Sequence, residues 1–174
     1  MVREKDGQWC LLSGSEEETE AWGSRLAPVL EPGDCVLLVG ELGAGKTCFV
    51  RGIARGLGVK ERVTSPTFIL LREHRGRLPL YHLDAYRLEG PEDLYMLGLD
   101  ELEEAGGVLA VEWGDRVRGF FLDDFLEIRI QIKGDSEREL TFIPHGAKWE
   151  ERLRAVFQGS HGGQPTGRGF GREG

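Results

Sequence analysis

The sequence predicts an α/β protein built on a mixed β-sheet, and three observations support this prediction. The apolar run Cys35–Val39 is typical of a buried strand, and it leads through the loop GELGAGKT into a stretch with helical spacing. The run VLAVEW at Val108–Trp113 indicates a second buried strand. Near the C-terminal end LEIRIQIK alternates between apolar and polar residues, which predicts a half-exposed antiparallel strand with one apolar face, formed by Leu126, Ile128, Ile130 and Ile132.

The N-terminal part begins with a predicted helix at residues 15–30. Ser15 and Glu18 have the spacing of a capping box, and apolar residues then recur at helical intervals. The tetrapeptide EPGD at Glu31–Asp34 predicts a turn before the first strand. After the loop a second helix is expected over about residues 46–57, where two glycines end it.

The remaining elements follow from shorter patterns. They are strands at Phe68–Arg72, Leu80–Asp84 and Arg138–Ile143, an acidic helical segment at Pro91–Ala105 broken near Gly98, and a last amphipathic helix at about Lys148–Phe157. The strand in RELTFI is the expected hairpin partner of LEIRIQIK. We expect residues 1–157 to form one domain and the glycine-rich residues 158–174 to form a disordered tail, because the tail has too little apolar surface to bury.

Composition and charge exclude several classes of protein. The chain has 174 residues and a formal net charge of −8, and its basic residues are dispersed. A role in nucleic-acid metabolism would therefore pass through a protein partner, and no direct DNA binding is expected. No run approaches the roughly 18 apolar residues of a membrane span, and the charged N-terminus is unlike a signal peptide. Three cysteines without CxxC spacing indicate neither a disulfide framework nor a zinc site, so we expect a soluble, cytoplasmic protein.

The loop at residues 40–47 matches the Walker A phosphate-binding pattern at every fixed position. Glycines allow successive backbone N–H groups to turn toward a phosphate, and the following helix adds its positive end. We expect Lys46 to reach the β- and γ-phosphate oxygens of a nucleotide, and the Thr47 hydroxyl to bind Mg²⁺. The predicted nucleotide-binding residues of this segment are Gly40, Glu41, Leu42, Gly43, Ala44, Gly45, Lys46, Thr47 and Cys48.

Two acids at the ends of predicted strands are candidates for the metal side of the site. Glu112 ends VLAVE, and Asp84 ends LPLYHLD. Because ligands of open α/β sheets lie beyond the carboxyl ends of the strands, both carboxylates can face the phosphates. One would hold Mg²⁺ while the other polarises a water, and the sequence leaves this division open.

Four other residues have two interpretations each. Ser65 and Thr67 belong either to an ordinary turn or to a switch-like segment near the γ-phosphate or the attacking water. Trp113 either packs in the core or borders the nucleotide. His82 is expected to be a packed or hydrogen-bonded histidine and not a metal ligand.

In order along the chain, GELGAGKT, SPTF, HLDAYRL and EW resemble the motifs of the bacterial TsaE (YjeE) family, the small ATPases of tRNA threonylcarbamoyladenosine synthesis. The resemblance covers roughly residues 10–157. It implies a P-loop NTPase fold, a three-layer sandwich whose central parallel strands are flanked by antiparallel strands. It also implies hydrolysis of ATP with Mg²⁺ in support of TsaB and TsaD, which modify tRNAs that read codons beginning with A. The tRNA would be held by these partners.

The resemblance also implies roles by position. Thr47 and Glu112 would be the Mg²⁺ ligands, and Asp84 would orient or activate the hydrolytic water or assist the metal. Ser65 and Thr67 would line the phosphate side, and Trp113 would lie close to the nucleotide. Arg87 would be a partner contact, a charge stabiliser or a member of a structural ion pair.

Two other functions remain open at this point. A small-molecule kinase would need a second substrate pocket and an arginine-bearing lid, and the acidic segment 91–105 is a poor lid for an anionic substrate. A nucleotide-dependent binding switch with negligible turnover is the second alternative. The chain lacks an Asn-Lys-x-Asp motif, which argues against a guanine-nucleotide protein.

Overall fold

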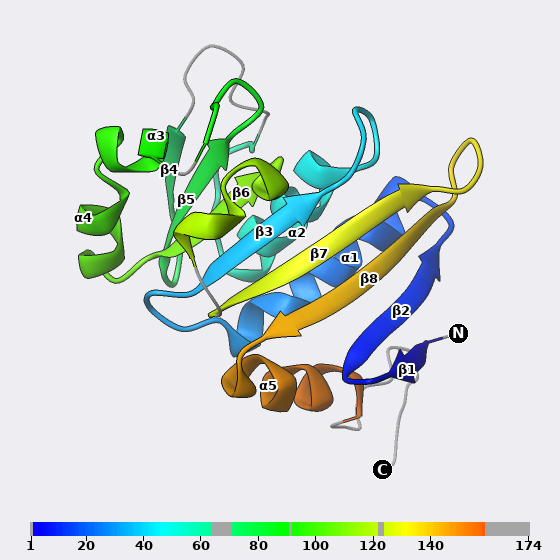
Figure 1. Ribbon diagram of the computed structural model, residues 1–174. Coiled ribbons are helices and arrows are strands. Elements are labelled where there is room, and N and C mark those ends of the chain that lie inside the picture. Colours follow the sequence, from blue (N-terminus) through cyan, green and yellow to red (C-terminus); the bar gives the residue numbers. More distant parts are fainter. Residues whose placement is uncertain (1, 64–70, 91, 122–123, 159–174) are drawn as a thin grey trace.

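The computed structural model of the chain describes residues 2–63, 71–90, 92–121 and 124–158. Eight strands form one mixed sheet in the order β1-β2-β8-β7-β3-β6-β5-β4 (Figure 1). The strands are β1 (Arg3–Lys5), β2 (Gln8–Ser13), β3 (Cys35–Val39), β4 (Leu71–Arg75), β5 (Pro79–Asp84), β6 (Val108–Glu112), β7 (Phe125–Ile132) and β8 (Arg138–His145). The helices are α1 (Glu16–Leu26), α2 (Lys46–Gly56), α3 (Glu92–Met96), α4 (Leu99–Glu104) and α5 (Ala147–Phe157).

The centre of the sheet is parallel and its margins are antiparallel. Strands β7, β3, β6 and β5 run in one direction, and the outer pairings of β8, β2, β1 and β4 are antiparallel. The expected parallel centre with antiparallel flanks is therefore confirmed. The four central strands have their carboxyl ends on the same side of the sheet, and the loop at residues 40–47 begins there.

Strand β7 has the predicted apolar face and the predicted antiparallel partner, but it also has a parallel neighbour that the sequence did not indicate. It pairs antiparallel with β8 but parallel with β3, so it lies inside the sheet. Leu126, Ile128 and Ile130 are buried under the helices, and only Ile132 at the strand end is exposed. On the opposite face Arg129 and Gln131 are exposed, as the alternation predicts, whereas Glu127 is buried.

Most other predicted elements agree with the structure within one or two residues, but the first helix ends at Leu26 and continues only as a 3-10 turn at Ala27–Val29. The Ser15 side chain caps α1 by accepting the backbone N–H of Glu18, as the capping box predicts. The acidic segment divides at Gly98 into α3 and α4. The strand expected from residue 68 lies partly outside the described residues, and β4 continues beyond Arg72 to Arg75. The edge strands β1 and β2 were not predicted, because their residues show no clear apolar alternation.

Helices cover the two faces of the sheet unequally. Helices α1, α2 and α5 lie on one face, and Figure 1 shows α1 and α2 behind the sheet, with α5 below β8. At the parallel centre α3 and α4 cover the other face through Leu94 and Leu99. The flanking helices of the predicted α/β class are thus present. In the described part of the chain no helix is long and apolar enough to cross a membrane.

Helices α1 and α2 pack against each other at unusually short range. A Cβ atom added to Gly52 would lie 1.9 Å from the carbonyl oxygen of Glu20, and one added to Gly23 would lie 2.3 Å from that of Phe49. Only glycine allows this approach, because any side chain would collide with backbone. The contact fixes the position of α2, and therefore of the loop that precedes it.

Candidate active site

The glycine-rich loop connects the end of β3 to the start of α2. Gly43 and Gly45 have φ angles of 81° and 114°, in the region that favours glycine, and Gly45 is the residue before the helix. Gly40 has no room for a side chain, since a Cβ there would lie 2.6 Å from the carbonyl oxygen of Ile130. At three positions of this loop the backbone conformation or the close packing therefore requires glycine.

Arg138 of β8 orients the peptide groups of this loop. Its Nε donates to the carbonyl of Ala44 at 3.0 Å, and its Nη2 donates to that of Gly43 at 3.2 Å. Because the peptide group is planar and trans, the N–H of Gly45 points away from Arg138. The first N–H groups of α2 have no partner within the helix, so they can bind an anion together with this N–H.

Lys46 is held by the loop itself. Its Nζ donates to the carbonyl oxygens of Gly40 at 2.7 Å and of Glu41 at 2.9 Å, and it lies 3.9 Å from the ring centroid of Trp113. Burial lowers the pKa of Lys46, although nearby carboxylates, with Glu112 first, partly oppose this effect. The ammonium therefore sits at the loop, ready to exchange carbonyl partners for an anionic ligand.

Glu112 ends β6 beside the loop and is 4% exposed. Its Oε2 lies 2.6 Å from the hydroxyl of Thr47, which donates to it, and 2.6 Å from Nε2 of His82. Burial acts to raise the pKa of Glu112, but it is outweighed first by the hydrogen bond and electrostatic effect of His82, then by the Thr47 hydrogen bond and the charge of Lys46, so the pKa lies below its ordinary value. An ionised carboxylate can only accept hydrogen bonds, so Nε2 of His82 is the donor in this contact.

Asp84 ends β5 directly beside Glu112, because the two residues are paired in the parallel register of β5 and β6. Its side chain is half-buried, and its Oδ1 accepts the backbone N–H of Tyr86 at 3.0 Å. The two strand-end acids expected from the sequence thus lie together at one edge of the sheet. Their roles stay predictions.

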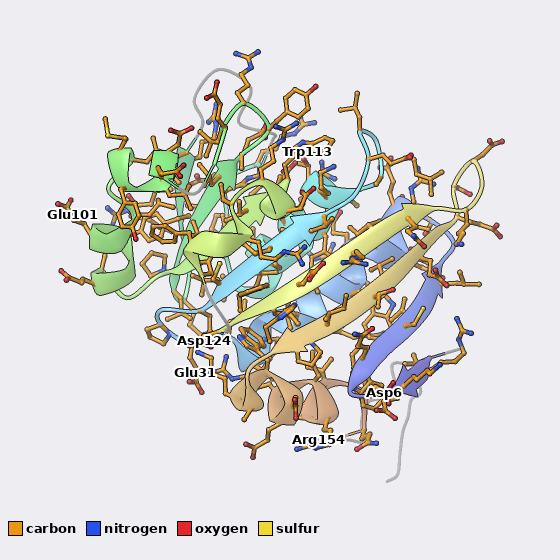
Figure 2. The ribbon with its side chains drawn as sticks, viewed as in Figure 1. Asp6, Glu31, Glu101, Trp113, Asp124 and Arg154 are labelled. Atoms are coloured by element: carbon orange, nitrogen blue, oxygen red, sulfur yellow. The ribbon has the colours of Figure 1, made fainter. Side chains whose placement is uncertain are left out.

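Trp113 and Tyr86 form an aromatic wall next to these acids. Trp113 has a φ angle of 62°, in the left-handed region, which turns the chain sharply after Glu112. Its ring lies 4.9 Å from that of Tyr86, and the Arg116 guanidinium lies 5.2 Å from the Tyr86 ring. Figure 2 shows Trp113 at the end of the sheet from which the loop projects.

These residues line one open cleft of about 570 Å³. It contains predicted residues from both sides of the loop: Leu42, Gly43, Gly45, Lys46, Thr47, Cys48, Asp84, Glu112 and Trp113. Sequence reasoning missed Glu16, Arg51 and Tyr86, which also line it. Arg51 follows Thr47 by four residues on α2, so its helical spacing was a usable signal. Glu16 enters only through the packing of α1 on α2.

Several predicted residues lie elsewhere. Ser65 and Thr67 are outside the described residues. Gly40, Glu41 and Ala44 do not line the cleft, and Ala44 is fully buried in the core next to the loop. Arg87 is exposed and makes no ion pair within the described part of the chain, so the structural ion pair considered for it is not found there.

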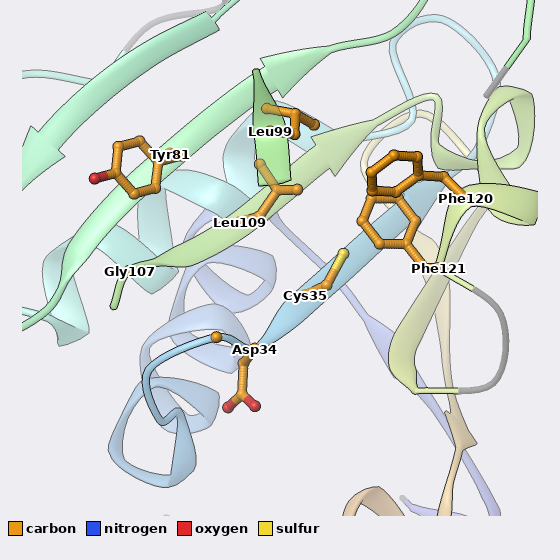
Figure 3. A pocket seen from close by; sticks show the side chains of 9 residues that line it. Asp34, Cys35, Tyr81, Leu99, Gly107, Leu109, Phe120 and Phe121 are labelled. Atoms are coloured by element: carbon orange, nitrogen blue, oxygen red, sulfur yellow. The ribbon is translucent and has the colours of Figure 1, made fainter. Parts of the chain in front are cut away.

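A second cavity lies at the opposite ends of β3 and β6. Phe120 and Phe121 lie on one side of it and Tyr81 on the other, with Cys35 and Leu109 between them (Figure 3). Its volume of about 30 Å³ could hold a water or two but no nucleotide. The open cleft, which the glycine-rich loop and the two strand-end acids line, is the candidate site.

Fold and site together define a class: an α/β protein whose glycine-rich loop, between a central parallel strand and its helix, faces two carboxylates on the ends of neighbouring strands. Comparison with known proteins then gives the family. The family model "Threonylcarbamoyl adenosine biosynthesis protein TsaE" matches residues 13–140, and the chain belongs to this family. The resemblance seen in the sequence motifs is thereby confirmed.

Individual relatives agree with this assignment. The chain is 45% identical over 130 residues to the tRNA threonylcarbamoyladenosine biosynthesis protein TsaE of Treponema pallidum, an alignment that covers 75% of this chain and 96% of that protein. It is 44% identical over 135 residues to the Bacillus subtilis protein of the same name, covering 77% and 84%. The crystal structure of Bacillus subtilis YdiB is similar with a TM-score of 0.75 and 38% identity, and the match covers 90% of this chain and 95% of that one.

Proposed function

We propose that this chain is a P-loop ATPase that binds and hydrolyses ATP with Mg²⁺ and thereby supports TsaB and TsaD in forming N6-threonylcarbamoyladenosine in tRNAs that read codons beginning with A. The observation that carries the proposal is the 2.6 Å hydrogen bond from the Thr47 hydroxyl to Glu112. It joins the last residue of the Walker A pattern to the acid of the neighbouring strand, a pair suited to holding Mg²⁺. The names of the relatives supply the pathway.

The phosphate side of the proposal rests on the loop and Lys46. The N–H of Gly45 and the free N–H groups at the start of α2 would bind the β-phosphate. Lys46 would leave the carbonyls of Gly40 and Glu41 for the β- and γ-phosphate oxygens. This exchange is favourable, because a charge-assisted hydrogen bond to phosphate is stronger than one to a neutral carbonyl.

The proposed Mg²⁺ rests on the charges of the cleft. Three carboxylates, those of Glu16, Asp84 and Glu112, line the same cleft as the loop. A triphosphate bound there would be repelled unless a cation lay between it and the acids. The Thr47 hydroxyl and the Glu112 carboxylate are oxygen donors of the kind that Mg²⁺ accepts beside phosphate and water, so the donor set fits. When bound, Mg²⁺ would neutralise charge that develops on the phosphates.

Hydrolysis in this proposal depends on Asp84. The backbone N–H of Tyr86 holds its carboxylate, and the register of β5 and β6 places it next to Glu112. Asp84 would orient the attacking water, while Glu112 and Thr47 hold the metal. Ser65 and Thr67 would complete the phosphate side.

The proposed partners are inferred from the net charge of the chain and from its family. With a net charge of −8, the chain itself is a poor tRNA ligand, so we propose that TsaB and TsaD bind the tRNA and that this ATPase acts on their complex in the cytoplasm. Residues 1–157 would act as a single domain, with residues 158–174 as its tail.

Reconstitution tests the proposal. The chain is mixed with TsaB, TsaD, a threonylcarbamoyl donor, tRNA and ATP, and modified tRNA is counted over many turnovers, with Lys46→Ala as the matched inactive variant. We expect multiple turnovers only with the unaltered chain and ATP. Modification that is independent of the chain would refute the proposal. A requirement for ATP without its hydrolysis would indicate the binding switch, and phosphate transfer to a small molecule would indicate the kinase.

A further inference from the structure

We infer that His82 is a positioning residue of this site, which fixes the Glu112 carboxylate so that it faces Thr47 and the metal position. The inference rests on the proposed function, because it concerns how the proposed Mg²⁺ ligand is held. His82 itself would touch neither nucleotide nor metal.

The position of His82 follows from the strand register. His82 is fully buried on β5 and pairs directly with Ala110 of β6, while Asp84 pairs with Glu112. The small side chain of Ala110 leaves space for the imidazole to reach diagonally to Glu112, two residues farther along β6. The resulting distance from Nε2 to Oε2 is 2.6 Å.

Two donors hold the same carboxylate oxygen. The Thr47 hydroxyl comes from α2 and the His82 imidazole from β5, and both contact Oε2 of Glu112. Neither of these contacts uses Oε1. With Oε2 fixed from two directions, the torsions of Glu112 are restricted, and Oε1 is left for a ligand in the cleft. Hydrogen-bond partners of this kind set the orientation and basicity of metal-binding carboxylates.

Packing alone does not explain a histidine at this position. Glu112 is its one hydrogen-bond partner in the described part of the chain, and its Nδ1 is buried without a partner. A buried polar atom without a partner is destabilising, and a leucine would fill similar space without that cost. The polar contact to Glu112 is therefore the property that the imidazole supplies.

The other described histidines serve different contacts. His74 contacts Glu61, and His145 contacts Glu127, and neither glutamate lines the cleft. His145 is the better control, because Glu127 is a buried glutamate on β7 with no contact to the loop. A change there alters a histidine–glutamate contact without altering the candidate site.

The test compares two amides at residue 82. In His82→Gln the side-chain amide nitrogen lies about where Nε2 lies, so it can donate to Glu112, whereas the shorter amide of His82→Asn cannot reach it. The first measurement is ATP affinity with and without Mg²⁺, and the second is the Mg²⁺ concentration for half-maximal hydrolysis with the partner proteins present. Melting temperatures identify variants that do not fold.

In His82→Asn we expect the gain in ATP affinity that Mg²⁺ provides to fall by about 10- to 100-fold, and the Mg²⁺ concentration for half-maximal hydrolysis to rise by a similar factor. The ATP affinity in the absence of Mg²⁺ should be unchanged. His82→Gln should restore most of this loss, and His145→Asn should leave both readouts at the wild-type value. A folded His82→Asn variant with wild-type Mg²⁺ dependence would overturn the inference, and so would equal losses in the Asn and Gln variants. If the wild-type chain binds Mg²⁺ and ATP but hydrolyses nothing, the proposed function fails, while the binding data still decide the role of His82.

Discussion

Glu112 and Glu127 are two buried glutamates in one sheet that are held in opposite ways. They are 4% and 1% exposed, each is contacted by Nε2 of a histidine, and the pKa of each lies below its ordinary value. Glu112 ends a strand at the cleft, whereas Glu127 lies within β7 on the face away from α1 and α2. The similarity of the two acids makes the difference between their surroundings informative.

Glu127 has its charge cancelled by neighbours. Arg118 and Arg129 donate to its Oε2 at 3.1 and 2.9 Å, and Oε1 lies 3.0 Å from Nε2 of His145. Both carboxylate oxygens are therefore occupied. Burial acts to raise the pKa of Glu127, but the His145 hydrogen bond and the two arginines outweigh it. Such an acid connects the segment before β7 to β7 and β8, and it has nothing left for a ligand.

Glu112 is held chiefly by a hydroxyl and an imidazole. Lys46 is the nearby cation, but its ammonium is bound to carbonyl oxygens of the loop. The negative charge of Glu112 is thus retained at the wall of an open cleft. The comparison teaches that burial and a lowered pKa do not identify a functional acid: what matters is whether its charge is already neutralised inside the protein.

Removing a cation from each glutamate gives the largest expected difference. Lys46→Ala should weaken ATP binding by about 100-fold or more, because the phosphates lose their main side-chain cation. Arg129→Ala removes a cation from Glu127 and should leave ATP affinity unchanged. Isothermal titration of both variants with ATP measures this. Wild-type affinity of Lys46→Ala would show that the cleft is not a phosphate site.

Changing the acids themselves should separate activity from stability. Glu112→Gln and Asp84→Asn should each lower the hydrolysis rate by about 100- to 1000-fold, because they remove charge that faces the reacting phosphate. Both variants should remain folded, since an amide retains the shape of each side chain, and Glu112 has no arginine partner to leave unpaired. ATPase assays with the partner proteins measure the rate. Wild-type rates in both variants would contradict the site assignment.

Glu127→Gln should show the reverse pattern. Loss of the charge weakens three charge-assisted hydrogen bonds, but the two arginines are partly exposed, so we expect a cost of about 2 kcal/mol in the free energy of unfolding. For a domain of this size that corresponds to a drop in melting temperature of about 4–8 °C. Urea unfolding and calorimetry measure both quantities. A loss of hydrolysis per folded molecule would remove the distinction drawn between the two acids.

The smallest effect is expected in how the free energy of unfolding depends on pH in the acidic range. The folded pKa of Glu127 lies below its ordinary value of 4.5, so its stabilising contribution is complete above that value and is lost as the pH falls through the lower folded pKa. The free energy of unfolding should therefore fall less steeply in Glu127→Gln than in the wild type between about pH 5 and pH 3. Urea unfolding at a series of pH values measures the slopes, and equal slopes would exclude this contribution.

The sequence was sufficient for the parts of the candidate site that each carry a local pattern of their own. The loop, its helix and the two strand-end acids follow local patterns, so Lys46, Thr47, Asp84 and Glu112 were found. The surroundings of Glu127 could not be found in this way, because its partners come from separate segments and the alternation in LEIRIQIK does not report the neighbouring strand. Glu16 was missed for a related reason, since only the close packing of α1 on α2 brings it to the cleft.

The contact of Arg138 with the loop has a consequence for the order in which the protein can be completed. Arg138 follows Ala44 by 94 residues, so the Walker A segment leaves the ribosome long before the guanidinium that turns its peptide groups. The intervening chain must first add β6 and β7 on either side of β3, and these long-range pairings form slowly. A fragment that ends before Arg138 would carry the whole motif but would lack the guanidinium that orients its N–H groups. A segment of the candidate site that is made early is therefore among the last to acquire its final shape.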